Sequence, residues 1–319
     1  MTMRIQTLSA LAAVLTLGIG SSALAQTAPD RLTLMSGAPG GSWYPLSAGI
    51  AEILTEGGAP TTAEPGAANS NILNVASGTA DIAFTQTNAN WLATQGLGIF
   101  KEKVEGIVGL AVLFPQYAHT VVTVESGVTT YEELKGRDMA SQSLSAGSSQ
   151  IFNDTLRAHG MAGDEDLNIV TRGGPGVGSA AVRDRQVIGF VATTAPPTAA
   201  VSEVAATLPI RLLPIGEEAM AKLQEINPGY APGVIPGGLY TGVDEDVPTL
   251  VDNTVLLASV EMSDDEAYWI VKTLAEAAER ITGLSPAFAN FSPEVMAQVR
   301  GVEIHPGARR YYEEIGVLK

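Results

Sequence analysis

The fold of this chain is decided by the stretch Leu32-Thr33-Leu34-Met35-Ser36-Gly37-Ala38-Pro39-Gly40-Gly41-Ser42-Trp43-Tyr44. The apolar run at its beginning has the length and composition of a short β-strand. The glycine-rich segment that follows lets the backbone turn sharply. A helical pattern then extends from Tyr44 to Thr55. The stretch therefore predicts a strand, a tight turn and a helix in direct succession.

The same alternation continues along the chain. Further strands are predicted at Asp81–Thr85, Ile107–Leu113, His119–Val124, Leu167–Val170 and Ile188–Val191. Further helices are predicted at Asn69–Ala76, Ser148–His159, Gly178–Arg185, Pro197–Ala206, Asp264–Leu284, with Ser263 as its N-cap, and Pro293–Arg300. Strands that alternate with helices of about 10–15 residues predict an α/β fold with mostly parallel or mixed sheets.

The first 25 residues have the pattern of an export signal. Arg4 supplies a positive charge, an apolar run extends from Leu8 to Gly20, and Ser21 to Ala25 end in the small-x-small pattern of a cleavage site. The run is too short for a membrane span, which needs about 20 residues. We expect residues 1–25 to be removed and the mature protein to lie in the periplasm.

The length favours two lobes joined by a hinge. Removal of residues 1–25 from 319 would leave 294, which is long for one hydrophobic core. We predict that residues 26–117 and about 240–319 form lobe one, and that residues 118–239 form lobe two. The lobes would join near Pro115 to His119, and the chain would cross back between about Pro214 and Tyr240.

The composition excludes several classes of function. The formal net charge is −16, which argues against nucleic acid and anionic membranes as partners because both would be repelled. The chain has no cysteine, so disulfides, thiolate metal sites, cysteine nucleophiles and a lipid-modified N-terminal cysteine are excluded. A small anion is still possible, because one site can be locally positive within an acidic protein.

Three segments combine glycine, hydroxyl or amide residues with a predicted helix start. The first is the turn before Tyr44, whose amides and helix dipole would attract a carboxylate or phosphate without a Lys or Arg. The second runs from Ser143 to Ser149, and the third pairs Gly66–Asn71 with the strand end at Gln86. For each segment the alternative is structural: Trp43 can be a core residue, and the serines and Asn69 can simply cap helices.

The sequence offers no defensible catalytic or metal site. Gly176 to Ala181 match the dinucleotide pattern G-x-G-x-x-A, but no acidic residue follows at the expected distance. The only histidines, His119, His159 and His305, have no second ligand at metal-binding spacing. Acidic clusters such as Asp264-Asp265-Glu266 fall at turns or helix starts, where solvation or capping accounts for them. We therefore expect no catalytic residue, no metal and no cofactor.

Four motifs in order resemble those of the TAXI family, the extracytoplasmic solute receptors of TRAP transporters. They are Gly40-Gly41-Ser42-Trp43-Tyr44-Pro45-Leu46, then Gly66–Asn71 with Ser77–Gln86, Glu133-Leu134-Lys135-Gly136, and Ile235–Gly242. The sequence departs from the family at Ala68, at Trp43 and at Ala146-Gly147-Ser148. Because these departures fall in the expected cleft, they leave the ligand open.

The resemblance implies a periplasmic-binding-protein type II fold without catalysis. It also implies delivery of an organic acid, such as glutamate or 2-oxoglutarate, to a TRAP-type membrane permease. We expect a monomer that closes on a small anionic ligand. The predicted ligand-binding residues are Gly41, Ser42, Trp43, Tyr44, Asn71, Thr85 and Gln86 from lobe one, and Ser145, Gly147, Ser148, Ser149 and Thr194 from lobe two.

Two rival hypotheses remain open beside this one. The protein could be the receptor of an ABC importer for an oxyanion or sulfonate, or a periplasmic enzyme on the same two-lobed scaffold. A structural interaction module is a third possibility, which a tight affinity for a small molecule would make unnecessary.

Overall fold

The computed structural model describes residues 28–37, 42–144 and 146–319. The predicted signal peptide and the predicted ligand-binding residues Gly41 and Ser145 lie outside the described residues. The strands are β1 (Leu32–Met35), β2 (Thr61–Glu64), β3 (Ile82–Gln86), β4 (Ile107–Thr123), β5 (Asp138–Gln142), β6 (Asn168–Gly173), β7 (Gly189–Thr194), β8 (Ile210–Leu212), β9 (Ala231–Ile235) and β10 (Val247–Ser259).

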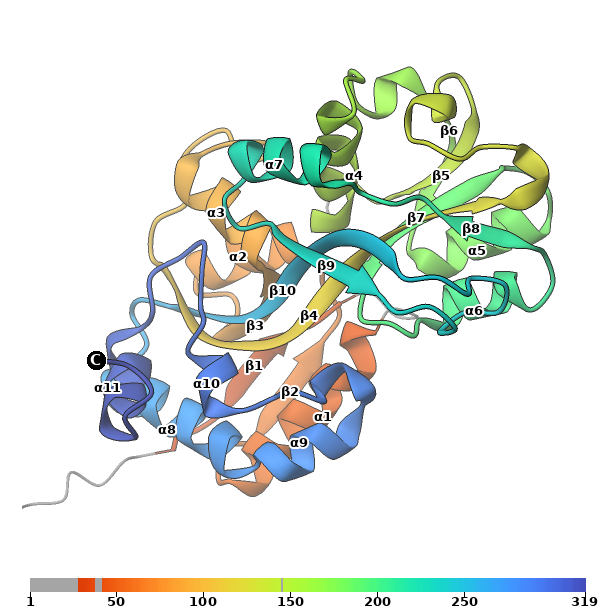
Figure 1. The fold of residues 1–319 in the computed structure, drawn as a ribbon. Helices are drawn as coiled ribbons and strands as arrows, with labels where there is room; N and C mark the ends of the chain where they lie inside the picture. The colour runs from red at the N-terminus through yellow and green to blue at the C-terminus, as the bar shows by residue number, and fades with distance from the viewer. Residues whose placement is uncertain (1–27, 38–41, 145) are drawn as a thin grey trace, which may run out of the picture.

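Helices surround these strands (Figure 1). They are α1 (Trp43–Glu56), α2 (Ala68–Ala76), α3 (Thr87–Gln95), α4 (Gly147–Ala158), α5 (Pro175–Arg183), α6 (Ala199–Ala205), α7 (Glu217–Ile226), α8 (Asp264–Glu276), α9 (Ala278–Leu284), α10 (Pro293–Met296) and α11 (Pro306–Glu314), with short 3₁₀ turns between some of them. The predicted α/β fold is confirmed. Across the described part of the chain, no helix has the length and apolar character needed to cross a bilayer.

The strands form one mixed sheet in the order β2-β1-β3-β10-β4-β7-β5-β6, with β8 paired to β4 and β9 to β10. The pairs at the two ends of this order are parallel: β1 with β2 and β3, and β5 with β6 and β7. The pairs at the centre, around β4 and β10, are antiparallel. Each end of the sheet is therefore a strand–helix unit of the kind that the sequence predicts.

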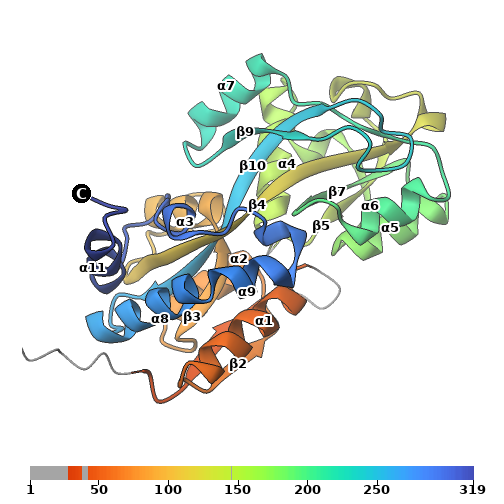
Figure 2. The ribbon, with the colours of Figure 1, turned by 60° about the horizontal axis from the view of Figure 1, so that its bottom comes forward.

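Two long strands run between the two ends of the molecule (Figures 1 and 2). β4 has 17 residues and β10 has 13, and they pair antiparallel from Val251 opposite Tyr117 to Ser259 opposite Ile107. The prediction of separate strands at Ile107–Leu113 and His119–Val124 is wrong, because both belong to β4. Pro115 lies opposite Asn253 of β10, and β7 and β8 pair with β4 only from Tyr117 onward. Pro115 therefore has a strand neighbour on one side alone, where a residue without an N–H is tolerated.

The C-terminal helices differ from the prediction in length. The helix predicted at Asp264–Leu284 is divided into α8 and α9, because the backbone leaves the helical region at Ala277 (φ −91°, ψ 11°). The helix predicted at Pro293–Arg300 ends after one turn, at Met296. The N-cap prediction is confirmed: the Ser263 hydroxyl accepts from the amide of Glu266, and the Glu266 carboxylate accepts from the amide of Ser263.

The buried apolar residues that the structure describes form three clusters. One cluster draws its members from residues 28–114 and 256–318, together with Ala195. The other two draw theirs from residues 117–250. The division into two lobes and its boundaries stay a prediction. Figure 2 shows α5 and α6 beside β5 and β7 at one end of the molecule, and α1 and α8 beside β2 and β3 at the other.

Candidate ligand-binding site

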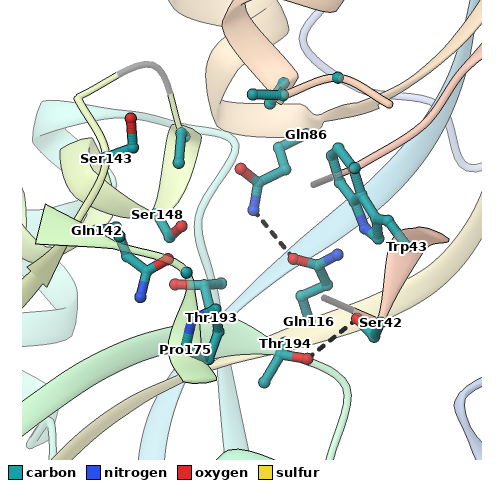
Figure 3. Close-up of a pocket in the computed structure, with 18 residues that line it drawn as sticks. Ser42, Trp43, Gln86, Gln116, Gln142, Ser143, Ser148, Pro175, Thr193 and Thr194 are labelled. Atoms are coloured by element: carbon teal, nitrogen blue, oxygen red, sulfur yellow. Dashed lines mark hydrogen bonds between the residues drawn. The ribbon is translucent and has the colours of Figure 1, made fainter. Parts of the chain in front are cut away.

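A cavity of about 310 Å³ lies where the strands of both ends of the sheet finish and their helices begin (Figure 3). Its volume is within the range of sites for small molecules. Crevices at the carboxyl ends of strands are the usual place for ligands in open α/β sheets. The cavity is lined by Gly37, Ser42, Trp43, Gly66, Ala67, Ala68, Gln86, Gln116, Gln142, Ser143, Ala146, Gly147, Ser148, Gly173, Gly174, Pro175, Thr193 and Thr194.

Four helices begin at this wall: α1, α2, α4 and α5. Their N-cap residues are Ser42, Ala67, Ala146 and Gly174, and in each helix no N-cap side chain accepts a hydrogen bond from the first turn. The first amides of a helix have no partner within the helix itself, and the helix dipole adds partial positive charge at the same end. The third amides of α4 and α5 bond to their N-cap carbonyls (Ser149 to Ala146, Val177 to Gly174), and Pro175 has no N–H. The amides of Gly147, Ser148 and Gly176 are then the ones without a partner inside these two helices.

The lining contains no ionisable side chain among the residues that the structure describes. The neighbouring residues 38–41 and Ser145 are uncharged as well. The polar side chains of the lining are three glutamines and the hydroxyls of serine and threonine. An anion in this cavity would therefore be bound by main-chain amides, helix dipoles and neutral hydrogen-bond donors.

Hydrogen bonds hold the polar side chains of the wall in place. The side-chain amide of Gln116 lies 3.1 Å from Gln86 Nε2 and 2.8 Å from Thr254 Oγ1. With its oxygen toward Thr254 it accepts from that hydroxyl, and its nitrogen donates to the carbonyl of Thr193 at 3.1 Å. The indole of Trp43 donates to the hydroxyl oxygen of Thr254 at 3.1 Å. The hydroxyls of Ser42 and Thr194 lie 3.2 Å apart, so this contact joins the predicted lobes (Figure 3). Each of these contacts joins two neutral groups.

Six of the predicted ligand-binding residues line the cavity: Ser42, Trp43, Gln86, Gly147, Ser148 and Thr194. Trp43 is 8% exposed and meets the ring of Phe84 edge to face. It therefore combines the core role and the cavity role that the sequence left as alternatives. Tyr44 is 40% exposed and lies outside the lining.

Asn71, Thr85 and Ser149 also lie outside the lining, and all three are buried. Asn71 Nδ2 donates to the carbonyls of Ser36 (2.7 Å) and Phe84 (2.8 Å), and its Oδ1 accepts from the amide of Ala67 (3.1 Å). It therefore connects the ends of β1 and β3 to the start of α2. The Thr85 hydroxyl donates to the carbonyl of Val255 at 3.3 Å.

The sequence reasoning missed Gln116, Gln142, Thr193 and the segment Gly173-Gly174-Pro175 as lining residues. A signal existed for the last of these, because two glycines and a proline between a strand and a helix are typical of a tight turn with proline at the first helical position. Gln116 gave no local signal. It lies within the long strand β4, and only the sheet places it beside Gln86.

The buried titratable groups near the site have structural partners and lie outside its lining. His119 Nδ1 lies 2.8 Å from the carbonyl of Tyr117, and its Nε2 lies 3.0 Å from the hydroxyl of Tyr240. Burial lowers the pKa of His119 to about 4, so this imidazole is neutral at pH 7. Among the described residues, no group of three His, Asp or Glu is arranged to hold a metal ion.

The family model of the NMT1-like family matches residues 34–316, which is most of the sequence. The chain belongs to the NMT1-like family. This family assignment is broader than the resemblance to TAXI receptors, because it does not specify a TRAP transporter.

Solved structures share the fold of this NMT1-like protein at low sequence identity. A Bordetella bronchiseptica RB50 protein has a TM-score of 0.53 at 14% identity over 91% of this chain and 98% of its own. The periplasmic aliphatic sulphonate binding protein SsuA from Escherichia coli has a TM-score of 0.51 at 16% identity, over 90% and 84%. An ABC uptake transporter substrate binding protein from Streptococcus pneumoniae with bound histidine has a TM-score of 0.50 at 11% identity, over 82% and 93%. The predicted periplasmic-binding-protein type II fold is confirmed.

Proposed function

We propose that this NMT1-like protein is a periplasmic solute-binding protein that captures a small organic anion and passes it to a membrane transporter. The observation that supports the proposal is the convergence of four helix starts, none with a side-chain cap, on a cavity of uncharged lining. Such helix starts bind carboxylate, sulfonate and phosphate groups through main-chain amides. A carboxylate in the lining would oppose this binding, and the described lining has none.

The ligand would be gripped by two lobes. Ser42, Trp43 and Gln86 come from the predicted lobe one, and Gly147 and Thr194 come from the predicted lobe two. A ligand that contacts both lobes favours the closed arrangement, because only there are all of its contacts made. The bond between the hydroxyls of Ser42 and Thr194 belongs to that closed arrangement and should break when the lobes separate.

Titration calorimetry tests the binding proposal directly. The ligands to be titrated are C2 to C6 dicarboxylates, 2-oxo acids, acidic amino acids and short alkanesulfonates. Trp43 lies in the cavity wall, whereas Trp91 and Trp269 do not, so ligand binding should change tryptophan emission in the natural protein. The Trp43→Phe variant should lose this change. The absence of heat and of an emission change across the whole panel would contradict the proposal.

The finer proposal for the transporter is a TRAP-type permease, which the four TAXI-like motifs support. The second candidate is the receptor of an ABC importer, which the shared fold with a sulphonate binding protein favours. Uptake of the bound ligand into proteoliposomes separates the two. A TRAP-type partner needs an ion gradient and no ATP, whereas an ABC importer needs ATP inside the vesicle and no gradient.

We also propose export through residues 1–25 and action as a monomer. Mass spectrometry of the protein from the periplasmic fraction should give a chain that begins at Gln26. Light scattering should give the mass of one mature chain. A protein that keeps its first 25 residues in the cytoplasmic fraction, or a stable dimer, would contradict the respective proposal.

A further inference from the structure

Four helices begin in the wall of the cavity, and its described lining has no negative side chain to balance a cation. Each helix start is equivalent to roughly half a positive charge. α1, α2, α4 and α5 all begin in the wall, and the described lining has no Asp or Glu. An anionic group is therefore favoured at every helix start, and an ammonium group is disfavoured at every one of them.

A buried ammonium group needs hydrogen-bond acceptors and a negatively charged partner. It has three N–H donors and no acceptor, and a charged group in a buried site is costly unless it is paired and hydrogen-bonded. The side-chain acceptors in the lining are amide and hydroxyl oxygens, which can take single hydrogen bonds but carry no charge. The Gln116 oxygen is already engaged, because in the orientation that satisfies its neighbours it accepts from the Thr254 hydroxyl at 2.8 Å and from the Trp43 indole.

The two buried acidic residues of the described part of the chain do not line the cavity. Asp154, on α4, accepts from the hydroxyl of Tyr230 at 2.8 Å and pairs with Arg157 at 3.2 Å. Asp252, on β10, accepts from the main-chain amide of Asn88 at 3.2 Å. Both side chains are buried outside the lining, so neither is placed to pair with an α-ammonium group of a ligand in the cavity.

We infer that the site selects organic anions without an ammonium group, such as oxo acids, hydroxy acids, dicarboxylic acids or sulfonates, and discriminates against the amino acids of the same skeleton. This inference rests on the proposed function and narrows it, because the resemblance to TAXI receptors allows glutamate and 2-oxoglutarate alike. The apolar part of the ligand would lie against Trp43, Ala67, Ala68 and Pro175.

The expected discrimination follows from the cost of an unpaired charged donor. Leaving one charged group without its usual partners costs more than about 1–3 kcal/mol, and 1.4 kcal/mol is a factor of ten in affinity. We therefore expect each amino acid to bind at least about tenfold more weakly than its amine-free counterpart.

Calorimetry on matched pairs tests the inference with the natural mature protein. The pairs are 2-oxoglutarate and glutamate, succinate and aspartate, pyruvate and alanine, and ethanesulfonate and taurine. Weaker binding of the amine in every pair that binds supports the inference. An amino acid that binds as tightly as its counterpart overturns the inference and leaves the proposed function intact, whereas no binding by any member contradicts the proposed function itself.

A charge variant gives a second, independent readout. In Gln86→Glu a carboxylate enters the wall, and the nitrogen of the Gln116 amide faces residue 86 at 3.1 Å. We expect the variant to bind the amine-free acid at least about tenfold more weakly and to show a smaller ratio between acid and amino acid. If Gln86→Glu unfolds at the same temperature as the natural protein and the ratio between its affinities for the acid and for the amino acid is unchanged, the inference is overturned. If the variant does not fold, the matched pairs decide.

Discussion

Gly147→Ala is the sharpest single-atom perturbation of the proposed site. Gly147 is the first residue of α4 and lines the cavity. A β-carbon built on it would collide with Gln86 Oε1, and would lie 3.1 Å from Gln86 Cδ and 3.4 Å from Asn88 Oδ1. The atoms that it meets belong to the end of a flexible side chain, so Gln86 can move away while the backbone stays in place.

The effect on binding can be estimated from what Gln86 loses. Once displaced, its amide no longer contacts the amide of Gln116, which lies 3.1 Å away in the natural protein. In the proposed site Gln86 also offers a hydrogen bond to the ligand; a neutral hydrogen bond contributes about 0.5–1.5 kcal/mol, so its displacement should weaken ligand binding by about 2- to 12-fold. The added methyl also narrows the cavity. Alanine is favoured over glycine within helices by up to about 1 kcal/mol, which is similar in size and opposite in sign to the loss of the Gln86–Gln116 contact, so the thermal midpoint should change little.

Gly283→Ala is the matched control. Gly283 lies within α9, and a β-carbon there would have no neighbour within 4 Å. Calorimetry and thermal unfolding should show a natural dissociation constant for Gly283→Ala, a raised dissociation constant for Gly147→Ala, and an unchanged or higher thermal midpoint for both. If Gly147→Ala binds its ligand like the natural protein, the cavity between Gly147 and Gln86 is not the binding site.

Three further predictions concern buried polar residues. Asn71→Ala should lower the free energy of unfolding by about 2–4 kcal/mol, because two buried carbonyls lose their donor; a urea midpoint like that of the natural protein would contradict this. Thr254→Val removes the acceptor of the Trp43 indole and should cost about 1–3 kcal/mol in the same assay, and a cost near zero would show that the indole finds another acceptor. Burial raises the pKa of Asp252 to about 8, so the folded protein holds this proton more tightly than the unfolded chain. Stability should therefore fall as the pH rises from about 4 to 8, by at most about 1.4 kcal/mol per pH unit. Asp252→Asn should remove this part of the pH dependence. If urea unfolding gives the same difference in free energy of unfolding between the natural protein and Asp252→Asn at pH 5 and at pH 8, the shift is refuted.

Much of the architecture could be predicted because its signals are local. A strand, a glycine-rich turn and a helix start fall within about a dozen residues, and the residues of each element favour the structure that they form. This is why the sequence indicated α1, α2 and α4 to within about one residue at either end. The same locality led to Ser42, Trp43, Gly147 and Ser148, because they lie at the helix starts.

Residues with two possible roles could not be resolved in this way. Asn71 lies one helical turn from the start of α2, where its amide could face a ligand or the protein. Which it faces depends on Ser36 and Phe84, which reach it from other strands. Likewise, the polar residues Asp252 to Thr254 obscure β10 as a central strand, and only pairing with β3 and β4 makes it one.

The amino-acid sequence by itself determined the α/β class, the acidic and cysteine-free composition, and the positions where helices begin after strands. Only the tertiary structure decided that four of those helix starts meet in one cavity, that Gln116 and Gln142 join them, and that Asp154 and Asp252 lie outside it. The reason is physical: helix starts and turns follow from contacts between neighbours in the chain. The charge of a cavity depends on which side chains from distant parts of the sequence line its wall and which of them pair with other residues outside it.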